Sequence, residues 1–181
     1  MKLDSETGLL DVARQVSSPN RDDRPDGMSI DLLVIHNISL PPGEFGGPWI
    51  DDLFCNRLDP DGHEYFRVIC DMQVSCHFLI RRDGELVQYV PVQQRAWHAG
   101  QSSYQDHEGC NDFSIGIELE GSDDIPYEDS QYQALNELIA ALTEVYPALG
   151  SNIVGHSEIS PMRKTDPGPA FDWERLNNLI E

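Results

Sequence analysis

The chain has 181 residues, of which 39% are hydrophobic and 24% are charged, and this predicts one soluble globular domain spanning residues 1–181. The net charge of −20 argues against nucleic acid and against an anionic membrane as partners, because both require clustered Lys and Arg. No apolar run approaches the roughly 20 residues that span a bilayer. Acidic residues follow Met1 where a signal peptide carries bases, so we expect a cytoplasmic protein, and a monomer.

Residues 1–30 are predicted to be an irregular lead-in, because they are largely polar and rich in turn-forming residues. The apolar run Leu32–Ile35 predicts a strand that is buried on both faces and that ends on His36. Pro and Gly then break the chain at residues 41–48, and a short helical period follows at residues 49–58.

The rest of the chain alternates between strand and helix patterns. In chain order we expect strands at 77–81 and 86–90 around an Asp83-Gly84 hairpin signal, a polar loop at 98–112, a strand at 114–120, a helix at 129–146, a strand at 153–154 and a helix from residue 172. This mixture predicts an α/β fold of mixed, α+β-like character, with a central mixed β-sheet flanked by helices.

Four cysteines occur at positions 55, 70, 76 and 110. Their spacing fits neither a zinc-finger pair nor a redox Cys-x-x-Cys motif. In a cytosolic protein we expect them to be free, small core residues.

Two histidines and one aspartate form a candidate metal site. His36 and His156 each follow an apolar strand pattern, and Asp166 lies in a loop stiffened by Pro167-Gly168-Pro169. Three protein ligands with an open fourth position are typical of a hydrolytic zinc rather than a structural one, so we expect one Zn²⁺ per chain. The alternative is ordinary: a histidine at a strand end often bonds to the backbone, and Asp before Pro often begins a turn.

Two further residues suggest a catalytic mechanism. Glu118 lies on the polar face of the strand at 114–120 and is the candidate general base, with Glu120 on the same face as its competitor. Lys164 is one of only two lysines and is predicted to stabilise an oxyanion, with Arg163 as the alternative donor. Without a metal, both glutamates would instead be solvated strand residues.

Substrate contacts are predicted for Trp97, His98 and Asn37. The indole of Trp97 can pack on a sugar ring or an aliphatic peptide, and the following Ala-Gly pair permits close backbone approach. Asn37 follows the first candidate ligand and can bond to a substrate amide. Trp97 is equally compatible with a place in the core.

Four segments of the chain resemble the zinc amidases of cell-wall recycling, and most closely the 1,6-anhydro-N-acetylmuramyl-L-alanine amidases. The segments occur in the same order and are spread over most of the chain: residues 33–43, 95–100, 110–121 and 164–169. The resemblance implies the mixed-sheet fold of the amidase and peptidoglycan-recognition superfamily. It also implies His36, His156 and Asp166 as zinc ligands, Glu118 as base and Lys164 as transition-state stabiliser.

The implied reaction is cleavage of the amide between the lactyl group of anhydromuramic acid and the L-alanine of a muropeptide, during cytoplasmic peptidoglycan recycling. The implied partner is therefore this small molecule. Gly109 and Gln73 depart from the family pattern, because members often carry basic residues there that hold a diaminopimelate carboxylate. The alternatives are a peptidoglycan-fragment binding module without catalysis and a secreted wall-lytic amidase.

Overall fold

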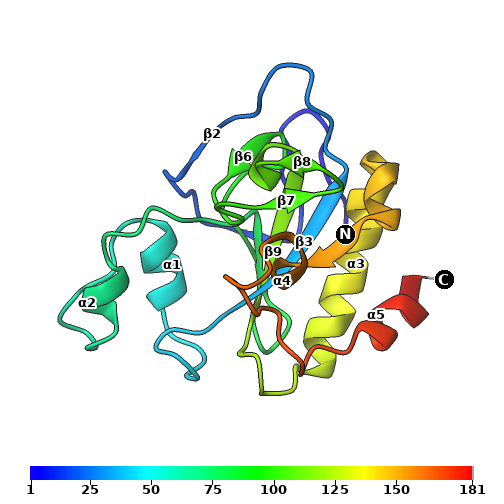
Figure 1. Cartoon of the computed structure of the whole chain (residues 1–181). Helices are drawn as coiled ribbons and strands as arrows, with labels where there is room; N and C mark the ends of the chain where they lie inside the picture. Colours follow the sequence, from blue (N-terminus) through cyan, green and yellow to red (C-terminus); the bar gives the residue numbers. More distant parts are fainter. Residues whose placement is uncertain (181) are drawn as a thin grey trace.

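The computed structural model describes residues 1–180 and arranges them around a six-stranded mixed β-sheet with strand order β1-β5-β4-β9-β3-β10 (Figure 1). Its strands are β1 (Arg14–Gln15), β3 (Leu32–Ile38), β4 (Phe78–Ile80), β5 (Leu86–Gln88), β9 (Ser114–Glu120) and β10 (Ile153–Gly155). Neighbouring strands are parallel except β4 and β5, which form the predicted hairpin. The predicted mixed α/β architecture is confirmed.

Helices and small sheets surround this central sheet. The helices are α1 (Trp49–Phe54), α2 (Phe66–Ile69), α3 (Asp129–Val145), α4 (His156–Ile159) and α5 (Trp173–Ile180), with 3₁₀ turns η1 (Cys110–Asp112) and η2 (Pro147–Ser151). Two-stranded sheets pair β2 (Arg21–Asp23) with β6 (Gln94–Ala96) and β7 (Ser103–Tyr104) with β8 (His107–Glu108). Among the residues that the structure describes, no helix is both long and apolar enough to cross a bilayer.

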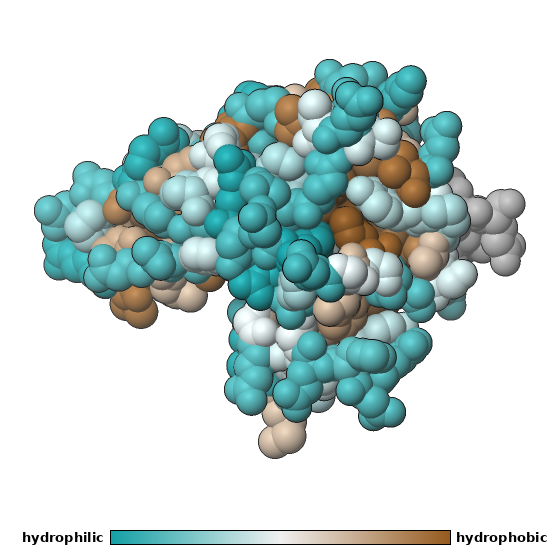
Figure 2. Space-filling view, turned by 90° about the horizontal axis from the view of Figure 1, so that it is seen from above, coloured by the Kyte–Doolittle hydropathy of each residue, from teal (hydrophilic) through white to brown (hydrophobic). Residues whose placement is uncertain are grey.

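The two faces of the sheet are covered by different parts of the chain. On one face, Ile35 and Ile117 belong to an apolar cluster with Leu138 and Leu142 of α3. On the other, strand residues such as Leu79 pack against α1 and α2. We call residues 41–74, which carry these two helices, the arm; it projects to the left in Figures 1 and 2.

A third apolar cluster contains residues of β3 and β10. It joins Leu32 and Val34 of β3 to Phe113, Val154 and Ile159. Successive strand residues point to opposite faces, so His36 shares its face with Leu32 and Val34. Hydrophilic residues cover most of the molecular face seen in Figure 2, in keeping with the charge of −20.

The lead-in at residues 1–30 is more ordered than predicted. β1 joins the central sheet beside β5, β2 pairs with β6, and Ser18 and Asn20 are buried. The prediction was wrong because these segments obtain their backbone partners from strands about 70 residues away, which local composition does not reveal. The predicted loop at 98–112 likewise contains the β7–β8 pair.

Other predicted elements need smaller corrections or none. The first helix ends at Phe54 rather than residue 58, and β3 continues past His36 to Ile38. The long helix at Asp129–Val145 is confirmed, and a capping box formed by Glu128 and Gln131 fixes its start. All four cysteines are free, as predicted; Cys76 and Cys110 are buried.

Candidate metal centre and cleft

Strand register brings His36, Glu118 and His156 together. β3 and β9 are parallel neighbours, and their register places His36 opposite Glu118. On the other side of β3, Gly155 of β10 pairs with Ile35, so His156, the next residue, begins α4 beside His36. Three segments far apart in the sequence therefore meet at one end of the sheet.

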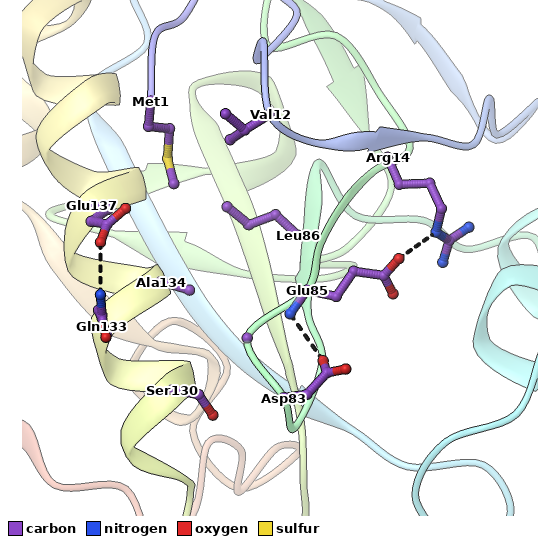
Figure 3. A pocket seen from close by; sticks show the side chains of 11 residues that line it. Met1, Val12, Arg14, Asp83, Glu85, Leu86, Ser130, Gln133, Ala134 and Glu137 are labelled. Atoms are coloured by element: carbon purple, nitrogen blue, oxygen red, sulfur yellow. Dashed lines mark hydrogen bonds and ion pairs between the residues drawn. The ribbon is translucent and has the colours of Figure 1, made fainter.

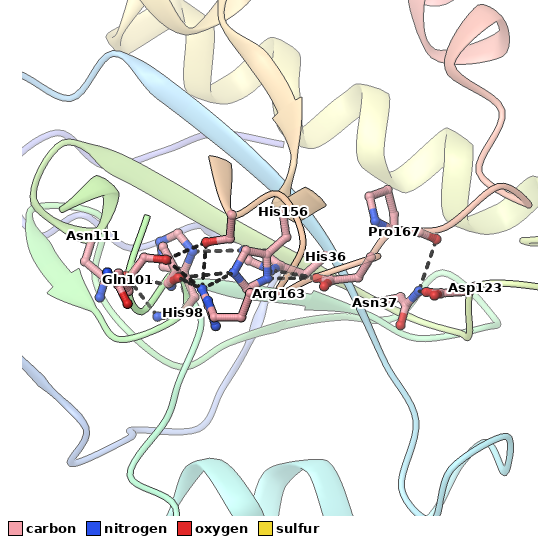
Figure 4. A network of polar contacts seen from close by, with 12 residues as sticks. His36, Asn37, His98, Gln101, Asn111, Asp123, His156, Arg163 and Pro167 are labelled. Atoms are coloured by element: carbon pink, nitrogen blue, oxygen red, sulfur yellow. Dashed lines mark hydrogen bonds and ion pairs between the residues drawn. The ribbon is translucent and has the colours of Figure 1, made fainter. Parts of the chain in front are cut away.

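The three predicted ligands present one atom each to a common point. Nδ1 of His36 lies 2.9 Å from Nδ1 of His156, and each nitrogen lies 3.0 Å from Oδ2 of Asp166 (Figure 4 draws these contacts among the histidines). Both histidines are buried, and Asp166 is partly buried.

Hydrogen bonds alone do not satisfy this arrangement. Nε2 of His156 lies 3.1 Å from the carbonyl oxygen of Ala99, which only accepts, so Nε2 carries the hydrogen and Nδ1 a lone pair. A longer contact of 3.4 Å joins the same nitrogen to Arg163. Burial lowers the pKa of His36 to about 4, so this imidazole is neutral at neutral pH. Two imidazole nitrogens and a carboxylate oxygen that converge in this way fit a zinc ion.

A network of backbone contacts holds the loop that carries Asp166. The carbonyl oxygen of Pro167 accepts hydrogen bonds from Tyr127 Oη at 2.8 Å and from Asn37 Nδ2 at 3.0 Å. The missing side chain of Gly155 makes room for this loop, because a Cβ there would lie 2.8 Å from Pro167 Cδ. The position of Asp166 therefore depends on residues outside the donor set.

Glu118 points into the same cleft as the histidines. It is 9% exposed, and its Oε2 is buried without a hydrogen-bond partner among the described residues. Burial, reinforced by the negative charge of Asp166, raises the pKa of this carboxyl well above its usual value, although Lys164 opposes the shift. A buried carboxylate with a free oxygen and a raised pKa is suited to take up a proton.

Glu120 is occupied elsewhere. Its Oε1 accepts hydrogen bonds from Gly46 N at 2.6 Å and Arg81 Nη1 at 3.1 Å, and its Oε2 accepts one from Arg82 N at 3.2 Å. It is buried and lies outside the lining of the cleft that contains Glu118. Of the two glutamates on this strand face, Glu118 alone faces the histidines.

Lys164 and Arg163 also differ in their contacts. Lys164 is exposed and lines the cleft. Nη2 of Arg163 donates to the carbonyl oxygens of Ala99 at 2.7 Å and Gln101 at 2.9 Å, and to Ser160 Oγ at 2.7 Å. The guanidinium thus ties two loops together, whereas the Lys164 ammonium remains available to a ligand.

The cleft has a volume of about 390 Å³, with a polar end and an apolar wall. The polar end holds the histidines, Glu118 and Asp166, and the apolar lining includes Tyr65, Ile69, Met72 and Trp97. Trp97 is partly buried, and its Nε1 donates to Asp22 Oδ1 at 3.1 Å, which fixes the indole at the cleft wall. Its contact with substrate stays a prediction.

Two residues that the sequence marked as substrate contacts are engaged within the protein. Both amide hydrogens of Asn37 are used, by Asp123 Oδ1 at 2.8 Å and by Pro167 O. Both ring nitrogens of His98 have partners, namely His36 Nε2 at 2.9 Å and Ser114 Oγ at 3.2 Å. Both residues line the cleft, so their contact with substrate stays a prediction, while their visible contacts position neighbouring groups.

Sequence reasoning missed several supporting residues. Asn111 Oδ1 accepts from the backbone N–H groups of His98, at 3.1 Å, and Ala99, at 2.8 Å (Figure 4). Ser114 contacts the ring of His98, and Tyr127 donates a hydrogen bond to the loop that carries Asp166. The supporting role of Asn111 had a weak signal in the sequence, because an asparagine in a turn often bonds to nearby backbone groups. The sequence holds no local signal for the role of Tyr127.

Comparison with known proteins agrees with this geometry. The profile of the family described as N-acetylmuramoyl-L-alanine amidase matches residues 26–169. The chain is 61% identical over 173 residues to the 1,6-anhydro-N-acetylmuramyl-L-alanine amidase AmpD of Citrobacter freundii, which covers 96% of this chain and 92% of that protein.

Solved structures show the same fold. A crystal structure of a selenomethionine AmpD derivative superposes with a TM-score of 0.97 at 60% identity, covering all of both chains. A complex of the Escherichia coli amidase AmiD with the substrate anhydro-N-acetylmuramic acid-L-Ala-D-γ-Glu-L-Lys superposes with a TM-score of 0.60 at 32% identity, covering 98% of this chain and 65% of that chain. The chain therefore belongs to the N-acetylmuramoyl-L-alanine amidase family, among the 1,6-anhydro-N-acetylmuramyl-L-alanine amidases.

Proposed function

We propose that this amidase uses one zinc ion to hydrolyse the amide between (1,6-anhydro-)N-acetylmuramic acid and the L-alanine of muropeptides. The identity of 61% to a protein named for this reaction supports the substrate class. The solved structure of a related amidase, 32% identical, is a complex with an anhydromuramyl peptide as its substrate. The departures at Gly109 and Gln73 leave the length of stem peptide that is read as a separate question.

One observation carries the proposal: the lone-pair-bearing atoms of His36, His156 and Asp166 converge within 3.0 Å. Glu118 lines the same cleft, and its buried Oε2 has no hydrogen-bond partner among residues 1–180. We propose these three residues as the zinc ligands. A zinc ion bound there would supply Lewis acidity, which lowers the pKa of water and polarises a carbonyl oxygen.

Glu118 is the proposed general base. Its carboxylate takes a proton from the water that attacks the amide carbonyl, and then delivers this proton to the departing alanine nitrogen. Its position opposite His36 across β3 and β9 places it at the same end of the sheet as the ligands. Burial raises the pKa of this carboxyl, which favours uptake of the proton from water.

Lys164 is the proposed electrostatic stabiliser. Lys164 lines the same cleft as Asp166, and its ammonium would stabilise the negative charge that develops on the carbonyl oxygen. Trp97, His98 and Asn37 are the proposed substrate contacts, with the indole and the apolar wall suited to the faces of a sugar ring.

We further propose that the protein acts in the cytoplasm, in peptidoglycan recycling, as a single-domain monomer. Four free cysteines support a reducing compartment. Cell fractionation tests the compartment. A single cooperative unfolding transition and a light-scattering mass near 20.4 kDa test the domain and oligomer assignments.

The deciding experiment is mass spectrometry of the products formed from an anhydromuramyl tripeptide. We expect free tripeptide and the anhydro sugar acid, loss of both products after treatment with a chelator, and recovery on adding Zn²⁺. Full activity after complete metal removal would exclude the zinc mechanism. Binding of the peptide without cleavage would instead support a recognition module.

A further inference from the structure

A chain of polar contacts runs from the candidate zinc ligand His36 away from the cleft. Nε2 of His36 lies 2.9 Å from Nδ1 of His98, and Nε2 of His98 lies 3.2 Å from Oγ of Ser114. Oγ of Ser114 in turn lies 2.5 Å from the carbonyl oxygen of Cys110. The chain thus joins one imidazole of the donor set to a fixed backbone acceptor.

The hydrogen bond between Ser114 and the Cys110 carbonyl determines which atom donates in each of the other contacts. A carbonyl oxygen only accepts, so the Ser114 hydroxyl hydrogen lies between Ser114 Oγ and the Cys110 oxygen. Ser114 Oγ then accepts from His98, which places the hydrogen of His98 on Nε2 and a lone pair on Nδ1. This lone pair accepts from Nε2–H of His36, and the Nδ1 atom of His36 is left with a lone pair facing His156 and Asp166.

The two histidines of the donor set therefore have different supports. His156 donates directly to a backbone carbonyl, that of Ala99, whose polarity cannot change. His36 contacts another imidazole, which can accept or donate at either nitrogen. Asp166 Oδ2, 3.0 Å from His36 Nδ1, also only accepts and favours hydrogen on that nitrogen. The tautomer with hydrogen on Nε2 and a lone pair on Nδ1 therefore depends on His98 being held as an acceptor.

Packing holds the His98 ring in the position from which it contacts both His36 and Ser114. The ring lies against the backbone of Gly116 in β9, where a Cβ would come within 2.4 Å of His98 Cγ. The backbone N–H of His98 donates to Asn111 Oδ1 at 3.1 Å. Gly116 therefore gives the ring its place, and Ser114, two residues earlier on the same strand face, supplies its acceptor.

We propose that His98 and Ser114 are positioning residues that fix His36 in the tautomer whose Nδ1 lone pair faces the metal position, and so raise the affinity for zinc. The inference rests on the proposed zinc site. It assigns no chemical step to His98, which acts through His36. Outer partners of this kind typically change metal affinity or activity by about 10–100-fold.

The test measures zinc affinity of the full chain by competition with a chelating dye. We expect His98→Leu, which removes the acceptor at similar volume, to weaken zinc binding by about 10–100-fold. His98→Asn keeps an acceptor oxygen where Nδ1 lay and should recover most of the affinity. Ser114→Ala leaves His98 free to change tautomer, so we expect a smaller loss than in His98→Leu.

A second readout needs no metal. Long-range ¹H–¹⁵N correlation spectra of the zinc-free protein report which ring nitrogen carries hydrogen. Without zinc, Asp166 competes for hydrogen on His36 Nδ1, so we expect the fraction with hydrogen on Nε2 to be larger in the parent protein than in His98→Leu or Ser114→Ala. A purely structural role of His98 would not change this signature. Ser114→Ala also keeps the test available if His98→Leu does not fold.

Cys110→Ala is the matched control, because it truncates a buried side chain near Ser114. It keeps the backbone carbonyl of residue 110, which accepts the hydrogen bond from the Ser114 hydroxyl. Unchanged zinc affinity in Cys110→Ala together with a loss in His98→Leu supports the inference. An equal loss in both variants, or parent-like affinity and tautomer in His98→Leu, overturns it. Failure of the parent protein to bind zinc overturns the proposed function instead.

Discussion

Two surface hollows of this protein differ in what their polar groups do. The first is the histidine cleft, of about 390 Å³, described above. The second, the α3 hollow, has a volume of about 530 Å³ and lies between the N-terminal segment, the β4–β5 turn and α3 (Figure 3); its lining includes Met1, Val12, Arg14, Asp83, Glu85 and Glu137. The larger hollow is the less suited to chemistry.

In the α3 hollow the polar groups bond to one another. Arg14 Nε donates to Glu85 Oε1 at 2.8 Å, the Glu85 N–H donates to Asp83, and Gln133 donates to Glu137. In the histidine cleft, three atoms with lone pairs converge, and Glu118 Oε2 is buried with no hydrogen-bond partner in the part of the chain that the structure describes. Unsatisfied, convergent and buried polar atoms distinguish a site from a surface depression, whatever its volume.

The largest expected effect is loss of a zinc ligand. His156→Ala should lose bound zinc and lower kcat/KM by about 10³-fold or more, because several kcal/mol of charge stabilisation disappear and each 1.4 kcal/mol is tenfold. Elemental analysis and product formation measure the two effects. Zinc-loaded, active His156→Ala would contradict the donor set proposed for the histidine cleft.

Removal of the proposed base should have the next largest effect. Glu118→Gln keeps the shape of the side chain but cannot take up a proton, so we expect kcat to fall by about 10²–10⁴-fold with zinc content unchanged. Glu120→Gln is the matched control on the same strand face, and its contacts with Arg81 and Arg82 predict lower stability with turnover retained. Full turnover in Glu118→Gln would move the base role to another residue.

Lys164 should contribute less than the base. Lys164→Ala is expected to lower kcat by about 10²–10³-fold, the usual effect of removing one oxyanion donor. Arg163→Ala, its neighbour in sequence, should mainly lower the melting temperature, because Arg163 binds the carbonyls of Ala99 and Gln101. The opposite assignment of the two effects would make Arg163 the stabilising cation.

The candidate ligands and base could be predicted from the sequence more readily than the residues that hold them in place. The ligand types, the loop stiffened around Asp166 and the strand carrying Glu118 were visible, because residue type and strand alternation are local properties. Alternation placed Glu118 and Glu120 on one face, yet only the structure shows Arg81 bound to Glu120. That ion pair joins residues 39 positions apart, which no local pattern reports.

The same limit explains the errors in the fold. The central strands and α3 were predicted within a few residues, because their apolar residues follow a strand or helix pattern over several consecutive positions. β1 and β2 have two and three residues and are stabilised by pairing with β5 and β6. The role of His98 likewise depends on Ser114, whose hydroxyl reaches it only when the chain is folded.

A pH series tests the burial of Glu118 in the metal-free protein. Its folded pKa lies well above its ordinary value because of burial, so the unfolded chain ionises first as pH rises and the native state loses stability. Glu118→Gln removes this loss. The variant should melt above the parent near pH 7, with a difference that shrinks toward pH 4. A pH-independent difference would show that burial does not raise the pKa of Glu118 in the folded protein.

The smallest effect is expected in the α3 hollow. Arg14 pairs with Glu85 and Asp51 while its side chain is 41% exposed, and exposed ion pairs contribute about 0–1 kcal/mol. Arg14→Ala should therefore change the free energy of unfolding by less than about 1 kcal/mol and leave kcat, KM and zinc content unchanged. Denaturant melts and initial rates measure these values. A loss of turnover in Arg14→Ala would mean that the α3 hollow affects catalysis in the histidine cleft. The pairing of polar groups would then no longer distinguish a surface depression from a functional site.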